Sequence, residues 1–377
     1  MGKALLGLER IFRRASPSDP RAVSQVLVLE YRLTLGCCVH LSPLFEALKL
    51  CRPKLRIAVA TRALGAEVLR HSPFVDEIIE TANPLTDLPQ AVQDLRSGLR
   101  ARGLQPDCVL TGVADTRTRI DLLAALGASG WRGGFTQQPS FYHRPLQPDA
   151  GLSHIGNNLQ LARLLGCDSA PLEPRIYFTS KNAEIAGGLL KQANPHGQPV
   201  LALVTQTSGG QRPGWHMDRF VEVIHAAIAR GCALVYLGTA ADEGAIEAIR
   251  QAAGGVGCSI AGRTTVPELA AVIAMSDAVI SLDTGTMHVG RAVGVPMVVL
   301  GPSWQRPLEW MPLGLPNVRI LRGEDCDTIP AGYQLDEIEA ESVVAALDEL
   351  MAKYPPTAEA RAARVQRSLS EIDHLKR

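Results

Sequence analysis

Short apolar runs rich in Val, Ile and Leu alternate along this 377-residue chain with longer stretches of helical periodicity. Strands separated by helices of this length pair in parallel, because a crossover returns the chain to the same end of the sheet. The pattern therefore predicts an α/β fold built from βαβ units. We expect strands at 23–31, 55–61, 76–81, 106–113, 199–208, 233–239, 258–262, 277–285 and 296–303, and helices at 40–51, 65–72, 88–103, 121–129, 154–166, 183–193, 220–231, 241–253, 266–276 and 286–294.

The alternation runs through once and then restarts after a proline-containing connector at 169–180. Two α/β domains of similar size are therefore expected. The default ligand site of such a pair is the cleft between them. The expected boundaries are an N-terminal extension (1–22), a first domain (23–168), a linker (169–182), a second domain (183–350) and a C-terminal helical tail (351–377).

Composition and charge exclude several classes of function. Lys and Arg number 38 and Asp and Glu also number 38, so no nucleic-acid partner is expected. Eight cysteines occur without a CxxC pair, which argues against a zinc or iron–sulfur centre. They are interpreted as small buried hydrophobes in a reducing cytoplasm. No apolar run reaches the roughly 20 residues that span a bilayer, and no cofactor is expected.

The first residues, 1–15, lack a signal-peptide core but combine apolar and basic side chains. One interpretation is a short helix on a membrane surface, which would make the protein peripheral to the cytoplasmic face of the inner membrane. The other is a surface helix or a disordered leader. The apolar set is Leu5, Leu8, Ile11 and Phe12, and the basic set is Lys3, Arg10, Arg13 and Arg14.

The strongest local signal is a buried run that ends at Leu282 and is followed by a polar turn and a helix. Ligands of open parallel sheets bind at such strand ends, and the amides at a helix N-terminus attract anions. Asp283 is placed to accept hydrogen bonds from hydroxyls, and Gly285 would let a diphosphate approach the backbone. His288, one turn into the helix, could face the same pocket. The alternative is that Asp283 caps the helix and His288 is structural.

A second signal is the loop at 205–215, which combines hydroxyls, glycines and a cation after a buried run. Loops of this kind can bind phosphate, although the GKS or GKT of a P-loop is missing. The alternative is an ordinary polar loop. Its candidate ligand-binding residues are Thr205, Thr207, Ser208 and Arg212.

The first strand–helix connection, at 33–48, is predicted to contain a tight turn at 35–38. Cys37 and His40 lie in or near that turn, and a thiol beside an imidazole raises the hypothesis of a nucleophile. The alternative is that both side chains only pack.

Taken together, these segments resemble glycosyltransferase family 9, the ADP-heptose:lipopolysaccharide heptosyltransferases. The most specific match is DTGTMHVGRAVGVPMVVLGPS (283–303), which is similar to the family's D-T/S-G-x-x-H-x-A-x-A-x-G-x-P run followed by G-P-T/S. At the front, LGCCVHLSPLFEAL (35–48) is similar to its opening G-D-x-x-x-x-x-P-x-L-x-x-L, and SPFVDEII (72–79) to its N-P-x-V-D-E-I. The resemblance covers residues 26 to about 350.

The resemblance implies a GT-B fold, in which two Rossmann-like domains face each other across a cleft. The first domain would hold the acceptor and the second the donor. It also implies an inverting, metal-independent glycosyltransferase. Such an enzyme would move a heptose-like sugar from a nucleotide-sugar donor, ADP-heptose, to a hydroxyl of a glycan or glycolipid such as the lipopolysaccharide core. The oligomeric state stays open.

Residue roles follow from the same resemblance. Asp283 would hold sugar hydroxyls, and the backbone from Thr284 through Gly285 to Thr286 would hold the leaving diphosphate. Arg212, with Thr207 and Ser208, would neutralise its charge, and His288 would support the pocket. Further donor contacts carried over are Asp242 or Glu243 on the ribose and Thr264 in the base pocket.

Two positions depart from the family pattern. Cys37 follows the opening glycine, where the family has an aspartate thought to act as general base. A thiol with the usual pKa of about 8.5 is a poor substitute for a carboxylate. The family's phosphate-binding lysine falls on Pro213, but the adjacent Arg212 can hold a phosphate. The donor side is therefore retained, and the acceptor side is altered.

Three explanations of Cys37 stay open. Another residue, such as Asp115 or His40, serves as the base; or the enzyme relies on positioning and electrostatics with a different acceptor; or the chain binds a nucleotide sugar without transferring it. A sugar-nucleotide epimerase, which shares the GT-B fold, is the remaining alternative class.

Overall fold

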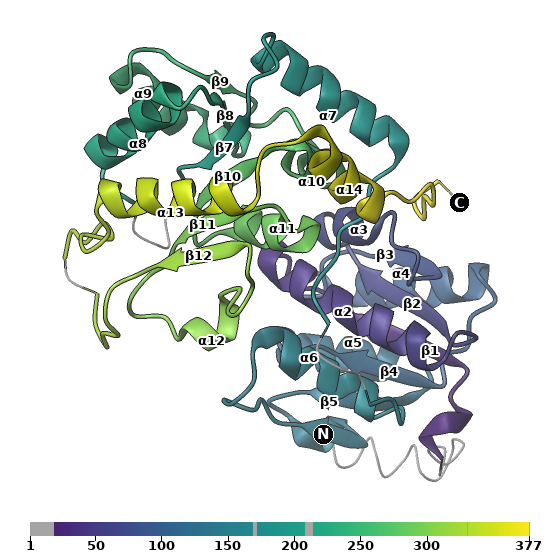
Figure 1. Ribbon diagram of the computed structural model, residues 1–377. Coiled ribbons are helices and arrows are strands. Elements are labelled where there is room, and N and C mark those ends of the chain that lie inside the picture. Colours follow the sequence, from purple (N-terminus) through teal and green to yellow (C-terminus); the bar gives the residue numbers. More distant parts are fainter. Residues whose placement is uncertain (1–18, 169–171, 208–213, 330, 377) are drawn as a thin grey trace. The chain divides into compact units, whose positions relative to one another are not determined.

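The computed structural model describes residues 19–168, 172–207, 214–329 and 331–376 (Figure 1). The chain divides into two compact units: unit 1 comprises Met1–Pro174 with Ile372–Arg377, and unit 2 comprises Arg175–Glu371. Each unit contains a six-stranded parallel sheet, which confirms the predicted α/β class. The segment 1–15, for which an interfacial helix was one interpretation, lies outside the described residues.

The sheet of unit 1 has the strand order β3-β2-β1-β4-β5-β6. Its central strands are buried apolar runs, as expected of parallel strands covered on both faces. Helices α4 and α5 pack into one core with Leu27 and Leu29, and α2 packs against α6. The elements are β1 (Gln25–Leu29), α2 (Leu35–Cys51), β2 (Arg56–Thr61), α3 (Leu64–Leu69), β3 (Glu77–Glu80), α4 (Leu88–Ala101), β4 (Cys108–Thr111), α5 (Thr118–Gly127), β5 (Trp131–Phe135), β6 (Arg144–Leu146) and α6 (His154–Arg163).

The sheet of unit 2 has the order β12-β11-β10-β7-β8-β9. Helices α8, α9 and α13 share a core with the strands, and α10 packs against α7, α11 and α14 (Figure 1). The elements are α7 (Ser180–Ala193), β7 (Val200–Val204), α8 (Met217–Ala229), β8 (Ala233–Tyr236), α9 (Glu243–Ala252), β9 (Cys258–Ser259), α10 (Val266–Met275), β10 (Ala278–Leu282), α11 (Gly285–Val293), β11 (Met297–Leu300), α12 (Pro307–Trp310), β12 (Val318–Leu321), α13 (Ala340–Lys353) and α14 (Ala358–Ser368).

Helix α2 differs from its prediction, because the expected turn at 35–38 is the first turn of the helix itself. The helix also continues through Pro43, which has no N–H to donate to the carbonyl of Val39. The hydroxyl of Ser42 donates to that carbonyl instead, at 2.8 Å. This local replacement keeps the helix continuous from the sheet edge to Cys51.

One prediction about the cysteines is wrong for two of them. Cys51, at the end of α2, and Cys167, after α6, form a disulfide with 5.9 Å between their Cα atoms. The other six cysteines are free, and four of those six are buried as expected. The crosslink ties the ends of two helices that already pack together.

Residues 372–376 complete unit 1 from the far end of the sequence. Arg70 makes a two-pronged ion pair with Asp373, at 2.9 and 3.0 Å. The ring of His374 contacts the carbonyl oxygen of Ser72 at 2.9 Å, and that of His71 contacts the carbonyl of Ile372 at 2.5 Å. No helix in the described parts of the chain is long and apolar enough to cross a bilayer.

A buried carboxyl group couples the stability of unit 1 to pH. Asp121 is fully buried on α5, where its Oδ2 accepts a hydrogen bond from Thr136 Oγ1 at 3.0 Å. Burial raises its pKa to about 6, against the opposing effect of hydrogen bonds from Thr136 and Tyr142. The folded chain therefore keeps the proton to higher pH than the unfolded chain does.

We expect the wild type to lose stability relative to Asp121→Asn as the pH rises from about 4 to about 6. Below that window both states of the wild type hold the proton, and above it the folded state must bury a charge. The difference should be on the order of 2 to 3 kcal/mol. Urea unfolding across the window would measure it, with the exposed Glu80→Gln as control. An unchanged pH dependence in Asp121→Asn would contradict the assignment.

Candidate functional site

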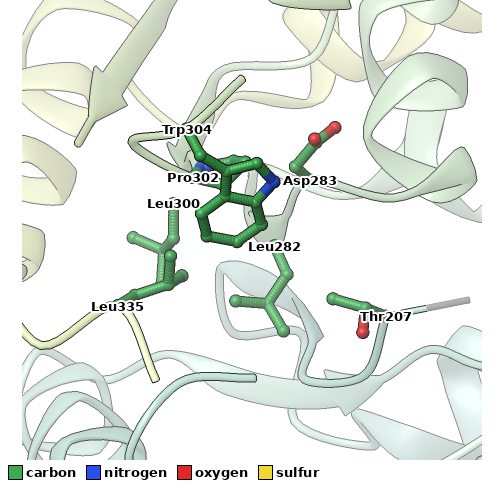
Figure 2. Close-up of a pocket in the computed structure, with 7 residues that line it drawn as sticks. All are labelled: Thr207, Leu282, Asp283, Leu300, Pro302, Trp304 and Leu335. Atoms are coloured by element: carbon green, nitrogen blue, oxygen red, sulfur yellow. The ribbon is translucent and has the colours of Figure 1, made fainter. Parts of the chain in front are cut away.

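The carboxyl ends of three adjacent strands of unit 2 line one small pocket. Thr207 follows β7, Asp283 follows β10, and Trp304 lies in the loop after β11. The pocket has a cavity volume of about 10 Å³. Figure 2 shows its seven lining residues, with the indole of Trp304 between Asp283 and the apolar side chains of Leu300 and Leu335. This cavity is far smaller than the usual ligand pocket, which measures roughly 300–1,000 Å³.

The turn after β10 leads directly into helix α11. Asp283 is 4% exposed, Thr284 occupies the N-cap position, and α11 begins at Gly285, one residue before the predicted start. The first amides of a helix have no preceding carbonyl to bond, and the helix dipole adds positive charge there. The start of α11, including Thr286, can therefore receive an anion. His288 is buried within α11, with its ring centroid 6.0 Å from that of Trp310.

The loop after β7 is described only up to Thr207. Thr205 is buried, and its hydroxyl oxygen accepts a hydrogen bond from Gln206 Nε2 at 3.4 Å. Thr207 lines the pocket beside Asp283. The predicted phosphate-binding residues Ser208 and Arg212 lie outside the described residues.

The predicted ribose and base contacts lie after β8 and β9, at the same edge of the sheet. Asp242 accepts hydrogen bonds from the amide and the hydroxyl of Thr239, each at 2.7 Å, and so forms a capping box. Glu243 accepts one from Ser259 Oγ at 3.0 Å. Thr264 is half-buried just before the cap of α10. The carboxylates of Asp242 and Glu243 therefore already accept hydrogen bonds from nearby residues of the chain.

In unit 1, the corresponding sheet edge gathers the residues predicted on the acceptor side. Cys37 lies in the first turn of α2. Asp115, in the loop after β4, accepts hydrogen bonds from the amides of Tyr31 at 2.5 Å and Arg32 at 3.2 Å. Arg117 pairs with the other oxygen of Asp115. Both oxygens of this buried carboxylate are thus engaged.

The structure adds a carboxyl group that the sequence patterns do not single out. Glu30 directly follows β1 and is 4% exposed. The Sγ of Cys38 lies 3.8 Å from Glu30 Oε1. A polar residue straight after a buried apolar run is the signal that marks this position in the sequence. Trp304, in the loop after β11, was missed in the same way.

Burial sets the protonation states in this cluster. It raises the pKa of Cys37 to about 11, so the thiol is neutral near pH 7. Burial, reinforced by the neighbouring Asp115, raises the pKa of Glu30 well above its ordinary value. Burial also raises the pKa of Asp115, against the hydrogen bond from Tyr31 and the charge of Arg117. Of the residues that surround Cys37, the two carboxyl groups are therefore the better proton acceptors.

The side chain of His40 has no surface that an acceptor could reach. It is fully buried in α2, with its ring centroid 5.5 Å from that of His154. Burial lowers the pKa of His154 to about 4, so that ring is neutral near pH 7. Across residues 19–168, 172–207, 214–329 and 331–376, no group of three or more His, Cys, Asp or Glu side chains is arranged to hold a metal ion.

The chain matches the model of a known protein family. The model of glycosyltransferase family 9 (heptosyltransferase) matches residues 121–326, which is more than half of the chain.

Two curated proteins are similar in sequence. Lipooligosaccharide heptosyltransferase 2 of Haemophilus influenzae is 29% identical over 169 residues, which cover 41% of this chain and 48% of that protein. Lipopolysaccharide heptosyltransferase 3 of Escherichia coli is 26% identical over 232 residues, covering 59% of this chain and 64% of that protein. The aligned segments thus span from about half to just under two thirds of these relatives.

Solved structures share the fold. A family 9 glycosyltransferase from Veillonella parvula has a TM-score of 0.76 at 19% identity, covering 90% of this chain and 100% of that one. ADP-heptose LPS heptosyltransferase II of E. coli gives 0.72 at 19% identity, covering 87% and 99%. E. coli heptosyltransferase WaaC with ADP gives 0.64 at 17% identity, covering 88% and 99%. These likenesses confirm the predicted GT-B fold class.

We expect iodoacetamide to alkylate Cys37 in the folded chain about tenfold more slowly than the half-buried Cys326 near neutral pH, because only a thiolate reacts. Peptide mass spectrometry of timed samples would measure both rates. In urea the two rates should converge. Rapid alkylation of Cys37 in the folded chain would restore it as a candidate nucleophile.

Proposed function

Since the chain belongs to glycosyltransferase family 9, we propose that it transfers a heptose from ADP-heptose to a hydroxyl of a lipopolysaccharide-type glycan. The family predicted from residues 283–303 is thereby confirmed. Support for this donor and acceptor class comes from the relatives, which are named lipooligosaccharide and lipopolysaccharide heptosyltransferases, and from a solved E. coli heptosyltransferase named with ADP.

The observation that carries the proposal is the pocket at the carboxyl ends of β7 and β10, beside the start of α11. A diphosphate suits this place, because helix amides and the helix dipole stabilise its charge. Asp283 holds hydroxyls of the transferred sugar, and the backbone from Thr284 to Thr286 holds the diphosphate. His288, inside α11, supports that wall of the pocket.

Further donor contacts come from the neighbouring loops. Thr205, Thr207 and Ser208 donate hydroxyl hydrogen bonds to the donor, and Arg212 neutralises the leaving diphosphate as its charge develops. Asp242 or Glu243 contacts the ribose, and Thr264 lines the base pocket. The segment 183–350 is therefore the donor domain and 23–168 the acceptor domain, joined by the linker 169–182.

In the reaction, the oxygen of an acceptor hydroxyl attacks the anomeric carbon and forms the new glycosidic bond. The bond from that carbon to the diphosphate oxygen breaks, ADP leaves, and the configuration inverts. The hydroxyl proton passes to a base of unit 1. No metal is assigned to these steps, because arginine and helix amides can balance the charge of the leaving diphosphate.

Glu30 is the base that the contacts favour. Cys37 holds its proton near pH 7, and both oxygens of Asp115 already accept hydrogen bonds. His40 is fully buried beside another imidazole. Glu30 lies next to Cys38, and its raised pKa brings its basicity closer to what neutral pH requires.

The alternative is a chain that binds the nucleotide sugar and does not transfer it, and Cys37 is what favours it. Binding of ADP-heptose without turnover on any glycan acceptor would support that alternative. For either function we place the protein in the cytoplasm. A peripheral position on the cytoplasmic face of the inner membrane would bring it to a glycolipid acceptor anchored there.

Asp283→Ala should lower kcat/KM for transfer by about 100-fold or more, because the variant loses the group that holds the sugar during transfer. The free energy of unfolding should change by about 1 kcal/mol or less. A coupled assay of ADP release and a urea titration would measure the two quantities. The exposed Glu359→Gln on α14 is the matched control. Full turnover by Asp283→Ala would refute the assignment.

Glu30→Gln should reduce kcat by about 10²- to 10⁴-fold while the Kd for ADP stays unchanged, because the amide cannot accept the proton. In the wild type, kcat should rise with pH as Glu30 ionises, and this limb should vanish in the variant. Rate profiles across pH, with Glu80→Gln alongside, would test this. Loss of turnover in Asp115→Asn but not in Glu30→Gln would make Asp115 the base.

A further inference from the structure

The loop after β11 presents an aromatic ring to the pocket that contains Asp283. Trp304 lines this pocket from its apolar side, together with Leu300 and Leu335 (Figure 2). The indole is half-buried, so one part of it packs against protein and another remains accessible. Among the described residues that line the pocket, Trp304 has the largest flat apolar surface.

One cation, the side chain of Arg322, holds the backbone of this loop. Arg322 Nη2 donates to the carbonyl oxygens of Ser303 at 2.9 Å, Gln305 at 3.2 Å and Pro302 at 3.4 Å. Three carbonyls bound to one guanidinium fix the path of the chain on both sides of Trp304. The side chain therefore starts from a defined backbone position.

The ring itself is braced by a second set of contacts. Tyr333 and Trp304 form a T-shaped pair, with 5.5 Å between ring centroids and an interplanar angle of 80°. The hydroxyls of Tyr333 and Ser303 both donate to Glu337. These contacts hold the indole in place before any ligand arrives, which is what a binding platform requires.

A strained backbone conformation occurs at another residue that lines this pocket. Leu335 is buried with a φ of 54°, a left-handed conformation that non-glycine residues adopt at an energetic cost. The strained residue points its side chain into the same pocket as Trp304. Strain of this kind persists where the surrounding structure imposes it, and it is concentrated at binding sites.

The order of the strands indicates which part of the donor meets the ring. On the proposed function, the diphosphate sits after β10, and the nucleoside lies toward β8 and β9, which Asp242 and Thr264 follow. Strand β11 lies on the opposite side of β10 in the sheet. The part of the donor that extends past the diphosphate toward β11 is the sugar.

We propose that Trp304 is the platform for the transferred pyranose, with the apolar C–H face of the sugar stacked on the indole while Asp283 holds its hydroxyls. The C–H bonds of a pyranose carry small positive charges, and the face of an aromatic ring is negative. This inference rests on the proposed function, and it makes Trp304 a determinant of sugar specificity rather than of nucleotide binding.

The test is calorimetric titration of the full chain with ADP and, separately, with ADP-heptose. Trp304→Ala should raise the Kd for ADP-heptose about tenfold or more and leave the Kd for ADP within about twofold. Trp304→Phe, which keeps an aromatic face, should recover most of the loss. Retained ADP binding shows at the same time that the variant is folded.

Equal weakening of both ligands, or no weakening of ADP-heptose, would overturn the role of Trp304 while leaving the proposed function intact. Failure of the unchanged chain to bind either ligand would overturn the proposed function and this inference together. If Trp304→Ala does not fold, Trp304→Phe decides the question: binding of both ligands close to that of the unchanged chain supports the platform, and weak binding of ADP-heptose beside normal binding of ADP overturns it.

Discussion

An aspartate that precedes a central strand fixes the register of each sheet, and the functional edges depend on it. In unit 2, Asp277 accepts the amide of Val200 at 2.8 Å and is itself held by Arg361 at 2.7 Å. In unit 1, Asp107 accepts the amide of Gln25 at 2.9 Å in the same way. A slip of one residue would exchange the two faces of a strand. These two aspartates, at the amino ends of β4 and β10, thereby help to decide which side chains emerge at the carboxyl ends.

The two units share this framework, but the carboxyl-end edges of their sheets differ in the charged groups that they contain. The edge of unit 2 offers helix amides at the start of α11, which suit an anionic ligand. The edge of unit 1 buries two carboxyl groups, Glu30 and Asp115, and burial, with the nearby Asp115 adding to it, raises the pKa of Glu30. Cys37 stands where the family has an aspartate, and its thiol stays protonated. This position therefore adds no third negative charge beside Glu30 and Asp115. Of these three groups at the sheet edge, the two that can carry a negative charge near pH 7 are therefore the carboxyls that follow β1 and β4.

Much of the fold can be predicted because its central strands are continuous apolar runs and its helices are strongly periodic. Strands β5 and β6 cannot, since Trp131–Phe135 contains two glycines and Arg144–Leu146 contains a proline. The turn after β10 is predictable because its chemistry is local in sequence. The roles of Glu30 and Trp304 cannot be predicted in this way, because they depend on which side chains the sheet places beside them. The disulfide could not be predicted either, because it joins cysteines 116 residues apart and no sequence motif pairs them.

Unit 1 is not a continuous stretch of sequence, because residues 372–376 return to it after unit 2 is complete. During synthesis on a ribosome, the partners of Arg70 and Ser72 therefore emerge only after about 300 further residues have been made. Until then the first half can collapse around its sheet but lacks its last ion pair. Translation therefore sets the order in which the two units finish folding. Unit 1, whose first residues are made first, is completed last.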